Sequence, residues 1–364
     1  MSATDELVGL DPAGAFAAAA GAVGELDHAA GRRAATHHDR LTKPRGSLGR
    51  LETLGVRLAA IAGSSPPPVP APAAVAVFAG DHGVVAEDVT PWPQDVTAQM
   101  VRNFLAGGAA INVLARQAGA RVLVVDVGVA TELEESPGLA RQKVRPGTGN
   151  LTHEPAMTVA EAREALDVGA AIAARLVADG ARCLVMGDMG IGNTTASAAL
   201  VASFTGRAAA DVTGRGTGID DATLTRKIAV VDRALAHSPR RDDPLAVLAS
   251  LGGLEVAALA GFAVGGAAAR VPVVADGVIA GAALLTASRL VPAVVPFCLA
   301  GHRSTEPAAR VVLEALELDP ILDLELRLGE GSGACLALPV LEAAARILAE
   351  MATFDAAGVT DKPR

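Results

Sequence analysis

Short apolar runs rich in valine and leucine recur along the middle of the chain, and segments long enough for a helix separate them. The runs cover residues 75–79, 122–127, 183–186, 271–275 and 291–299. Each run has the length of a strand buried on both faces, and parallel strands need crossover helices between them. Helical patterns fill the gaps at residues 96–117, 159–178, 194–204 and 221–237. The sequence therefore predicts an α/β fold with a mostly parallel sheet flanked by helices.

Both ends of the chain have a helical pattern instead. An alanine-rich region from Asp11 to Ala62 precedes a proline-rich stretch, 64–72, that a helix cannot cross. Residues 305–354 are helical again, with a glycine-rich interruption at 328–334. We expect residues 1–72 and 305–364 to pack together as a small helical domain beside an α/β domain of residues 73–304.

The amino-acid composition argues against binding to nucleic acid and to membranes. The net charge is −9, with one tryptophan and no tyrosine, so neither a basic surface nor aromatic platforms for nucleic acid are expected. Four charged residues cut the apolar stretch 254–301 into runs shorter than the roughly 20 residues of a membrane-spanning helix. The first ten residues show no basic region followed by an apolar one. We predict a cytoplasmic protein that binds neither nucleic acid nor a membrane.

Cysteine and histidine spacing bears on redox state and metals. Cys183, Cys298 and Cys335 lie far apart in apolar runs, which is typical of reduced thiols in a core. The seven histidines include no H-x-x-x-H pair and no cysteine at ligand spacing. We therefore predict no structural zinc.

Loops that follow the strands of a parallel sheet are where ligands collect. After the first predicted strand, Asp81 and His82 lie between glycines, and they either contact a ligand or form an Asx-type turn. After the third, three glycines lead into a helix that opens at Asn193. This arrangement predicts backbone N–H groups that cradle a phosphate, or else only a tight strand-to-helix turn. Its spacing fits neither the Walker pattern nor the dinucleotide fingerprint.

Two charged side chains are further candidates. Lys227 follows the glycine loop 213–220 and offers a point charge for a phosphate, unless it is a solvated surface lysine. Glu330 lies between two glycines in an apolar helical tail. Such surroundings raise the pKa of a carboxyl towards the range of a general base, and a solvated loop glutamate is the alternative.

Seven segments, taken in order, make a more specific pattern: KPRGSLGRLE, GDHGV, GDMGIGNTT, RKIAVVDRAL, ADGVIAGAA, GHRSTEPAA and RLGEGSGACLALP. From Thr42 to Ala357 the chain resembles the nicotinate-nucleotide:dimethylbenzimidazole phosphoribosyltransferases of cobalamin lower-ligand synthesis. The resemblance implies transfer of 5-phosphoribosyl from nicotinate mononucleotide to 5,6-dimethylbenzimidazole, giving α-ribazole 5'-phosphate and nicotinate. It also implies a cytosolic homodimer without a cofactor, with a Rossmann-like sheet and a small helical domain built from both chain ends.

The resemblance assigns roles to residues of this chain. The catalytic base falls on Glu330, in the loop carried by the C-terminal helices. Phosphate and ribose contacts fall on Asp188, Gly190, Ile191, Gly192, Asn193, Thr194, Lys227, Asp276 and Ser304. The pocket for the acceptor base falls on Asp81, His82, Trp92, Met100 and Leu328. Family members often carry glutamate where this chain has Asp188, so its ribose contact stays open, as does the preferred base.

Two other functions compete with this one. An NAD-linked oxidoreductase would need a G-x-G-x-x-G turn after an early strand and an acid about 20 residues further on, and neither is found near Val75 or Val122. A non-catalytic nucleotide sensor would keep the sheet and the phosphate loop. An accessible Glu330 argues against the sensor.

Overall fold

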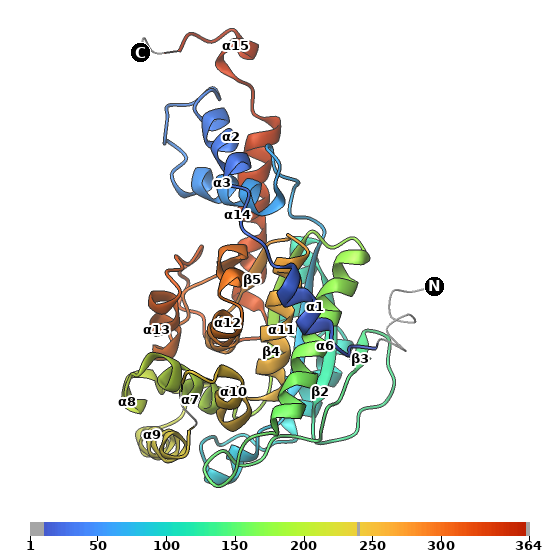
Figure 1. Ribbon diagram of the computed structural model, residues 1–364, viewed down its shortest axis with the longest axis vertical. Helices are drawn as coiled ribbons and strands as arrows, with labels where there is room; N and C mark the ends of the chain where they lie inside the picture. Colours follow the sequence, from blue (N-terminus) through green and yellow to red (C-terminus); the bar gives the residue numbers. More distant parts are fainter. Residues whose placement is uncertain (1–10, 239–240, 362–364) are drawn as a thin grey trace.

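A parallel sheet forms the centre of the molecule, as the computed structural model of residues 11–238 and 241–361 shows (Figure 1). Within these residues six strands lie in the order β3-β2-β1-β4-β5-β6, and every neighbouring pair is parallel. The strands are β1 (Ala73–Gly80), β2 (Arg121–Gly128), β3 (Leu139–Arg141), β4 (Cys183–Met189), β5 (Val273–Ala275) and β6 (Cys298–Ala300). This is the Rossmann order, with its reversal between β1 and β4. The predicted α/β class is confirmed.

The helices follow the predicted pattern with a few differences. Those between the first and last strands are α4 (Val96–Leu105), α5 (Ala110–Ala118), α6 (Val159–Ala178), α7 (Asn193–Thr205), α9 (Asp221–Ala236), α10 (Pro244–Leu251), α11 (Leu254–Ala268) and α12 (Val278–Leu290). Short elements are η1 (Gly83–Glu87), α8 (Ala209–Val212) and α15 (Phe354–Ala357). The single helix predicted over 96–117 is two helices, because Gly107 and Gly108 separate them.

The strand predicted over 291–299 is mostly a 3₁₀ helix, η2 (Pro292–Phe297). Pro292 and Pro296 lack backbone N–H groups and fix φ at about −65°, which suits the 3₁₀ turns observed there, and only Cys298–Ala300 pairs with β5. Strand β3 was not predicted, because three residues carry too short a pattern.

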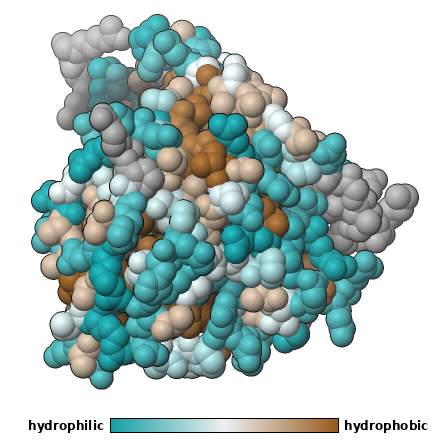
Figure 2. Space-filling view, turned by 60° about the horizontal axis from the view of Figure 1, so that its bottom comes forward, coloured by the Kyte–Doolittle hydropathy of each residue, from teal (hydrophilic) through white to brown (hydrophobic). Residues whose placement is uncertain are grey.

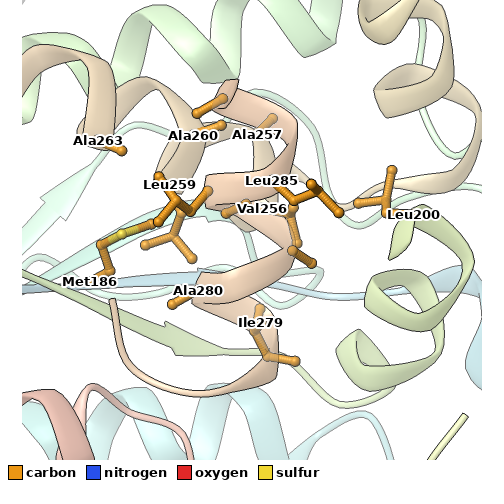
Figure 3. Packing of buried hydrophobic residues seen from close by; sticks show 14 of the residues in the cluster. Met186, Leu200, Val256, Ala257, Leu259, Ala260, Ala263, Ile279, Ala280 and Leu285 are labelled. Carbon is orange, nitrogen blue, oxygen red and sulfur yellow. The ribbon is translucent and has the colours of Figure 1, made fainter. Parts of the chain in front are cut away.

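Helices cover the two faces of the sheet. Alternate residues of β1 point to opposite sides, so Ala74, Ala76 and Phe78 pack towards α6 and α11. Val75 and Val77 pack towards α4, α5 and the long helix α14 (Ser332–Glu350). Figure 3 shows apolar residues of α11 and α12, both alanines and larger side chains such as Leu259, packed with Met186 of β4. The three predicted core thiols are buried and unbridged.

Glycines let α6 and α11 come into close contact. A Cβ atom added to Gly169 of α6 would overlap the carbonyl oxygen of Ala258 in α11, and one added to Gly261 would overlap that of Leu166. Because the overlapped atoms belong to the backbone, they cannot move aside as a side chain can. This contact fixes the distance of α11 from its neighbour.

We expect Gly169→Ala to lower the free energy of unfolding by about 3 kcal/mol, towards the upper end of the usual cost of overpacking. Urea unfolding followed by circular dichroism measures it. The matched control is Gly21→Ala in α1 (Ala15–Ala22), where nothing lies within 4 Å of an added Cβ. The control should gain up to about 1 kcal/mol from helix propensity. Equal stability of the two variants would contradict the close contact.

A smaller helical unit stands apart from the sheet (Figure 1). It consists of α2 (His28–His38), α3 (Arg50–Ala62) and the end of α14, which contacts both. A partly buried ion pair, with Lys43 Nζ 2.7 Å from Oε1 of Glu52, links the loop between α2 and α3 to the first turn of α3. Helix α14 begins beside the sheet and ends in this unit, so one helix joins the two parts.

Two helices from the terminal segments, 1–72 and 305–364, pack beside the sheet and not in the smaller helical unit. Helix α1 packs on α6 and α11, and α13 (Pro307–Ala315) packs on α12 and α7. Phe16 and Val311 carry apolar surface that the sheet layer buries. The boundary at residue 72 stays a prediction.

By length and composition alone, α14 is the one described helix that could cross a membrane. Its most apolar window of 18 residues is 56% buried inside the protein.

Candidate active site

A cavity of about 310 Å³ lies at the carboxyl ends of β4, β5 and β6. Its wall comes from α4, from the turns after these three strands, and from the segments 216–217 and 327–330. Figure 2 brings the bottom of Figure 1 forward, and in this view hydrophobic residues form a main patch in the upper middle and smaller areas elsewhere on a mostly hydrophilic face. The cavity is large enough for a small organic ligand.

Glu330 lies in a turn built from left-handed backbone. The φ angles of Gly329, Glu330 and Gly331 are +87°, +66° and +89°, and α14 begins at the next residue. The flanking glycines adopt this conformation freely, whereas the glutamate does so at a cost of roughly 1 kcal/mol. A Cβ atom on Gly187 of β4 would lie 2.7 Å from the carbonyl oxygen of Glu330, so the turn packs directly on the strand.

The carboxylate of Glu330 is buried in the cavity wall, with 5% of the residue exposed. Its Oε2 accepts a hydrogen bond of 3.2 Å from the N–H of Ile111 at the start of α5. Burial raises the pKa of this carboxyl, the bond from Ile111 opposes the rise, and the charge of Asp276 adds to it. A carboxyl with a raised pKa is a stronger base at neutral pH.

Lys227 brings a buried positive charge to the same cavity. Its Nζ donates to Oγ1 of Thr194 (2.7 Å), which is in the wall, and to the carbonyl oxygen of Gly214 (3.2 Å). Burial lowers its pKa to about 8, opposed by the charge of Glu306. Within residues 11–238 and 241–361 this ammonium forms no ion pair. A buried cation with only neutral partners is suited to bind an anion.

The turn after β4 has fewer free donors than the sequence suggests. The N–H of Ile191 donates to Oγ1 of Thr97 (3.1 Å). The N–H groups of Asn193 and Thr195 donate to the carbonyl oxygens at positions 190 (3.1 Å) and 192 (3.0 Å). These three N–H groups therefore already have acceptors within the protein. Lys227 is the stronger candidate for donating a hydrogen bond to a bound anion.

Asp188 is a second buried carboxyl in the wall. Its Oδ2 accepts a hydrogen bond of 3.1 Å from the amide of Asn193. Burial, followed by the charges of Asp276 and Glu255, raises the pKa of Asp188 well above its ordinary value. The protonated form that this favours can donate a hydrogen bond to an oxygen in the cavity.

The loop 213–218 closes one side of the cavity mouth. The indole Nε1 of Trp92, a half-exposed residue, donates to Oγ1 of Thr217 (3.0 Å). Arg327 donates to the carbonyl oxygen of Gly216 (2.8 Å), and the N–H of Gly216 donates to Glu306 (2.9 Å). Apolar wall residues on the other sides include Val96, Met100, Val278 and Ile279.

A family model described as phosphoribosyltransferase matches residues 23–359. The chain belongs to this phosphoribosyltransferase family. It is 56% identical to the nicotinate-nucleotide–dimethylbenzimidazole phosphoribosyltransferase of Salinispora tropica, over 94% of this chain and 98% of the relative. The Chloroflexus aurantiacus enzyme of the same name is 54% identical over 93% and 97%. The crystal structure of CobT from Thermus thermophilus superposes with a TM-score of 0.89 at 50% identity, covering 92% of this chain and all of that one.

Ten of the residues that sequence analysis assigned to the phosphoribosyltransferase site lie in the cavity wall. They are Trp92, Met100, Asp188, Gly190, Ile191, Asn193, Thr194, Ser304, Leu328 and Glu330. Lys227 reaches the cavity through its bond to the wall residue Thr194. The structure thus brings together side chains that are more than 200 residues apart in the sequence.

Asp81 and His82 are not in the wall, contrary to the prediction for the base pocket. His82 is fully buried, with Nε2 2.7 Å from Oε1 of Glu255. Asp81 accepts a hydrogen bond from the N–H of Ala130 (2.8 Å). The turn at Gly190 covers His82, because a Cβ atom there would lie 3.3 Å from the ring. Both side chains serve the packing beneath the turn.

Gly192 and Asp276 also lie behind the wall. A Cβ atom on Gly192 would meet Val85 and His82, so this glycine faces the protein interior. Both carboxylate oxygens of Asp276 are bonded to backbone N–H groups of residues 331 and 334. Neither residue is among those that line the cavity.

Four polar wall residues were not assigned from the sequence: Thr217, His302, Glu306 and Arg327. Each lies within a segment that was singled out, namely the glycine loop 213–220, GHRSTEPAA and RLGEGSGACLALP. Polar residues beside an assigned one in the same segment were the available signal. Their partners lie on distant segments, so the sequence alone did not select them.

Proposed function

We propose that this chain transfers the 5-phosphoribosyl group of nicotinate mononucleotide to 5,6-dimethylbenzimidazole, giving α-ribazole 5'-phosphate and nicotinate. The observation that carries the proposal is one cavity served by a buried lysine, which the described residues hydrogen-bond only through neutral groups, and by a buried glutamate of raised pKa. The first suits the phosphate of a nucleotide and the second suits a proton transfer. The names of the relatives support the same substrates.

The leaving group explains why a single base is enough. The nicotinate of the nucleotide is a pyridinium, so it departs as a neutral ring and needs no proton. The attacking nitrogen of the benzimidazole becomes positively charged as it bonds to C1' of the ribose. The other ring nitrogen must then lose its proton to complete the product.

Glu330 is the group proposed to accept that proton. Its carboxylate is in the wall and its raised pKa brings it nearer to the optimum of a general base. While ionised, it also stabilises the positive charge that develops on the attacking ring. Ile111 donates to only one of its oxygens, Oε2.

Positioning supplies the rest of the catalysis. Nucleophile and leaving group must occupy opposite faces of the ribose, because the reaction inverts C1'. We propose that Lys227, Thr194 and Ser304 hold the phosphate and ribose, while Trp92, Met100 and Leu328 border the acceptor ring. Anchoring the sugar phosphate between two flat rings converts an encounter of free molecules into a reaction within one complex.

The test is to incubate purified protein with nicotinate mononucleotide and a panel of benzimidazoles. Mass spectrometry should detect α-ribazole 5'-phosphate and an equal amount of released nicotinate. If nicotinate mononucleotide binds but no base in the panel yields a ribotide, the chain is a nucleotide sensor and the proposal is wrong.

We also propose that the enzyme works in the cytoplasm as a homodimer, as the family resemblance implies. Light scattering on the purified chain, whose mass is 36.4 kDa, should give twice that mass. A single-chain mass at micromolar concentration would contradict the dimer.

A further inference from the structure

Asp276 holds the turn that carries Glu330. It directly follows β5 and is 4% exposed. Its Oδ2 accepts the N–H of Gly331 (3.2 Å) and its Oδ1 accepts the N–H of Ala334 (2.9 Å). Both oxygens thus bind backbone of the turn and of the first turn of α14, where N–H groups lack helical partners.

The turn depends on these hydrogen bonds because its backbone is strained. Glu330 has a φ angle of +66°, which a glutamate adopts only when the surroundings fix it. The carboxylate end is tied to the N–H of Ile111, and the backbone end is tied to Asp276. The side chain is therefore held from two sides, by α5 and by the end of β5.

His302 and two glycines complete the contact between α14 and the sheet. His302 follows β6 and is 3% exposed, and its Nε2 lies 3.4 Å from Oδ1 of Asp276. A Cβ atom on Gly333 would overlap the ring of His302, and one on Gly301 would overlap Ala334. The start of α14 can therefore rest directly on the ends of β5 and β6, with Asp276 between them.

We infer that Asp276 is a positioning residue for the transfer reaction: it fixes the turn 329–334 so that the carboxylate of Glu330 faces the acceptor ring. This inference rests on the proposed function and replaces the phosphate or ribose contact that the sequence assigned to Asp276. A misplacement of about 1 Å at a reacting group can cost about 10²-fold in rate. A loosened turn therefore lowers turnover more than substrate binding.

The charge of Asp276 gives the inference a second readout. The ionisable groups that face it are His302, Asp188, Glu330 and Cys335. The negative charge raises the pKa of Glu330, so removing it lowers that pKa. Because Glu330 acts as a base only when ionised, the acid limb of the rate profile then moves to lower pH.

The experiment compares Asp276→Asn with the wild-type chain. Asparagine has one carboxamide oxygen, so one of the two backbone N–H groups loses its acceptor. We expect kcat to fall about 10- to 100-fold, KM for nicotinate mononucleotide to change less than about threefold, and the acid limb of kcat to move to lower pH. A raised KM with unchanged kcat would indicate that Asp276 contacts the substrate, as the sequence analysis assigned, and would overturn the inference.

Asp126→Asn is the matched control. Asp126 is also buried at the end of a strand, and its Oδ1 accepts two backbone N–H groups, those of Gly128 and Val129. It is not part of the cavity wall, so its loss should lower stability and leave kcat and its pH profile unchanged. If Asp276→Asn only matches this control, with an unmoved acid limb, Asp276 is merely structural and the inference fails.

His302→Gln serves if Asp276→Asn does not fold. Because His302 also lines the cavity, both constants are measured: loss of the imidazole beside Oδ1 should lower kcat several-fold with little change in KM, and an unchanged kcat or a raised KM would overturn the inference. Wild-type protein and Glu330→Gln are measured in the same assay. An inactive wild type contradicts the proposed function, whereas an active wild type with an unaffected Asp276→Asn contradicts only this inference.

Discussion

Replacing Glu330 by glutamine should lower kcat by about 10²- to 10⁴-fold, the usual contribution of a general base. Glutamine keeps the size of the side chain and can still accept the bond from Ile111, but it cannot take a proton from the acceptor ring. The fold and the KM for nicotinate mononucleotide should change little, because the proposed phosphate contact is made by Lys227 and not by Glu330. Steady-state release of nicotinate at saturating substrates measures the effect.

Glu325→Gln is the control for this prediction. Glu325 lies in the same C-terminal segment, also has a left-handed backbone with a φ angle of +56°, and is exposed outside the cavity wall. Its replacement should leave kcat unchanged, which separates the loss of the base from the loss of a glutamate on a strained turn. Near-normal turnover of Glu330→Gln would remove Glu330 from the catalytic role.

Replacing Lys227 by methionine should weaken binding of nicotinate mononucleotide by about 30-fold to several thousand-fold. This range corresponds to the roughly 2–5 kcal/mol that is lost when one partner of a buried charge pair is removed. Methionine fills the space of the lysine stem without its charge, so kcat at saturation should fall much less than kcat/KM. Isothermal titration calorimetry measures the affinity directly.

The same lysine predicts how affinity depends on pH. Its pKa in the free protein is lowered to about 8, so the ammonium loses its proton as the pH rises above that value. The phosphate is a dianion throughout this range, since its second pKa is about 6. Affinity should therefore fall above pH 8, by up to tenfold per unit, and this fall should be absent in Lys227→Met.

Lys143→Met is the matched control for both measurements. Lys143 is also largely buried, but it is paired with Asp126 and Glu132 outside the cavity wall. Its replacement should leave the affinity and its pH dependence as in the wild type. Equal affinities for Lys227→Met and the wild type would show that the phosphate binds elsewhere.

Local signals account for what the sequence predicted well. Helix α6 has the predicted bounds because Thr158 and Glu161 form a capping box at its start. Glu330 could be singled out because two glycines flank it in an apolar tail. The family likeness placed these features in one order, and the family is confirmed.

Contacts between distant segments account for what the sequence could not predict. Asp276 was taken for a substrate contact, but its oxygens bind N–H groups 55 and 58 residues further along the chain. His82 was taken for a pocket residue, but it pairs with Glu255, which is 173 residues away. No local pattern reports which buried group a polar side chain will meet. The roles of the site residues stay predictions until the variants are measured.

The helix that joins the two parts of the molecule also sets the order in which the enzyme is completed during synthesis. Chains fold from the N-terminal side as they leave the ribosome, at about 5–20 residues per second. The last strand of the sheet ends at Ala300, whereas the turn at Glu330 and the rest of α14 follow it. A nascent chain thus has its sheet and Lys227 before it has Glu330. A fragment ending at residue 304 would lack the carboxylate proposed as the base, so we expect the sheet domain by itself to be inactive as a transferase.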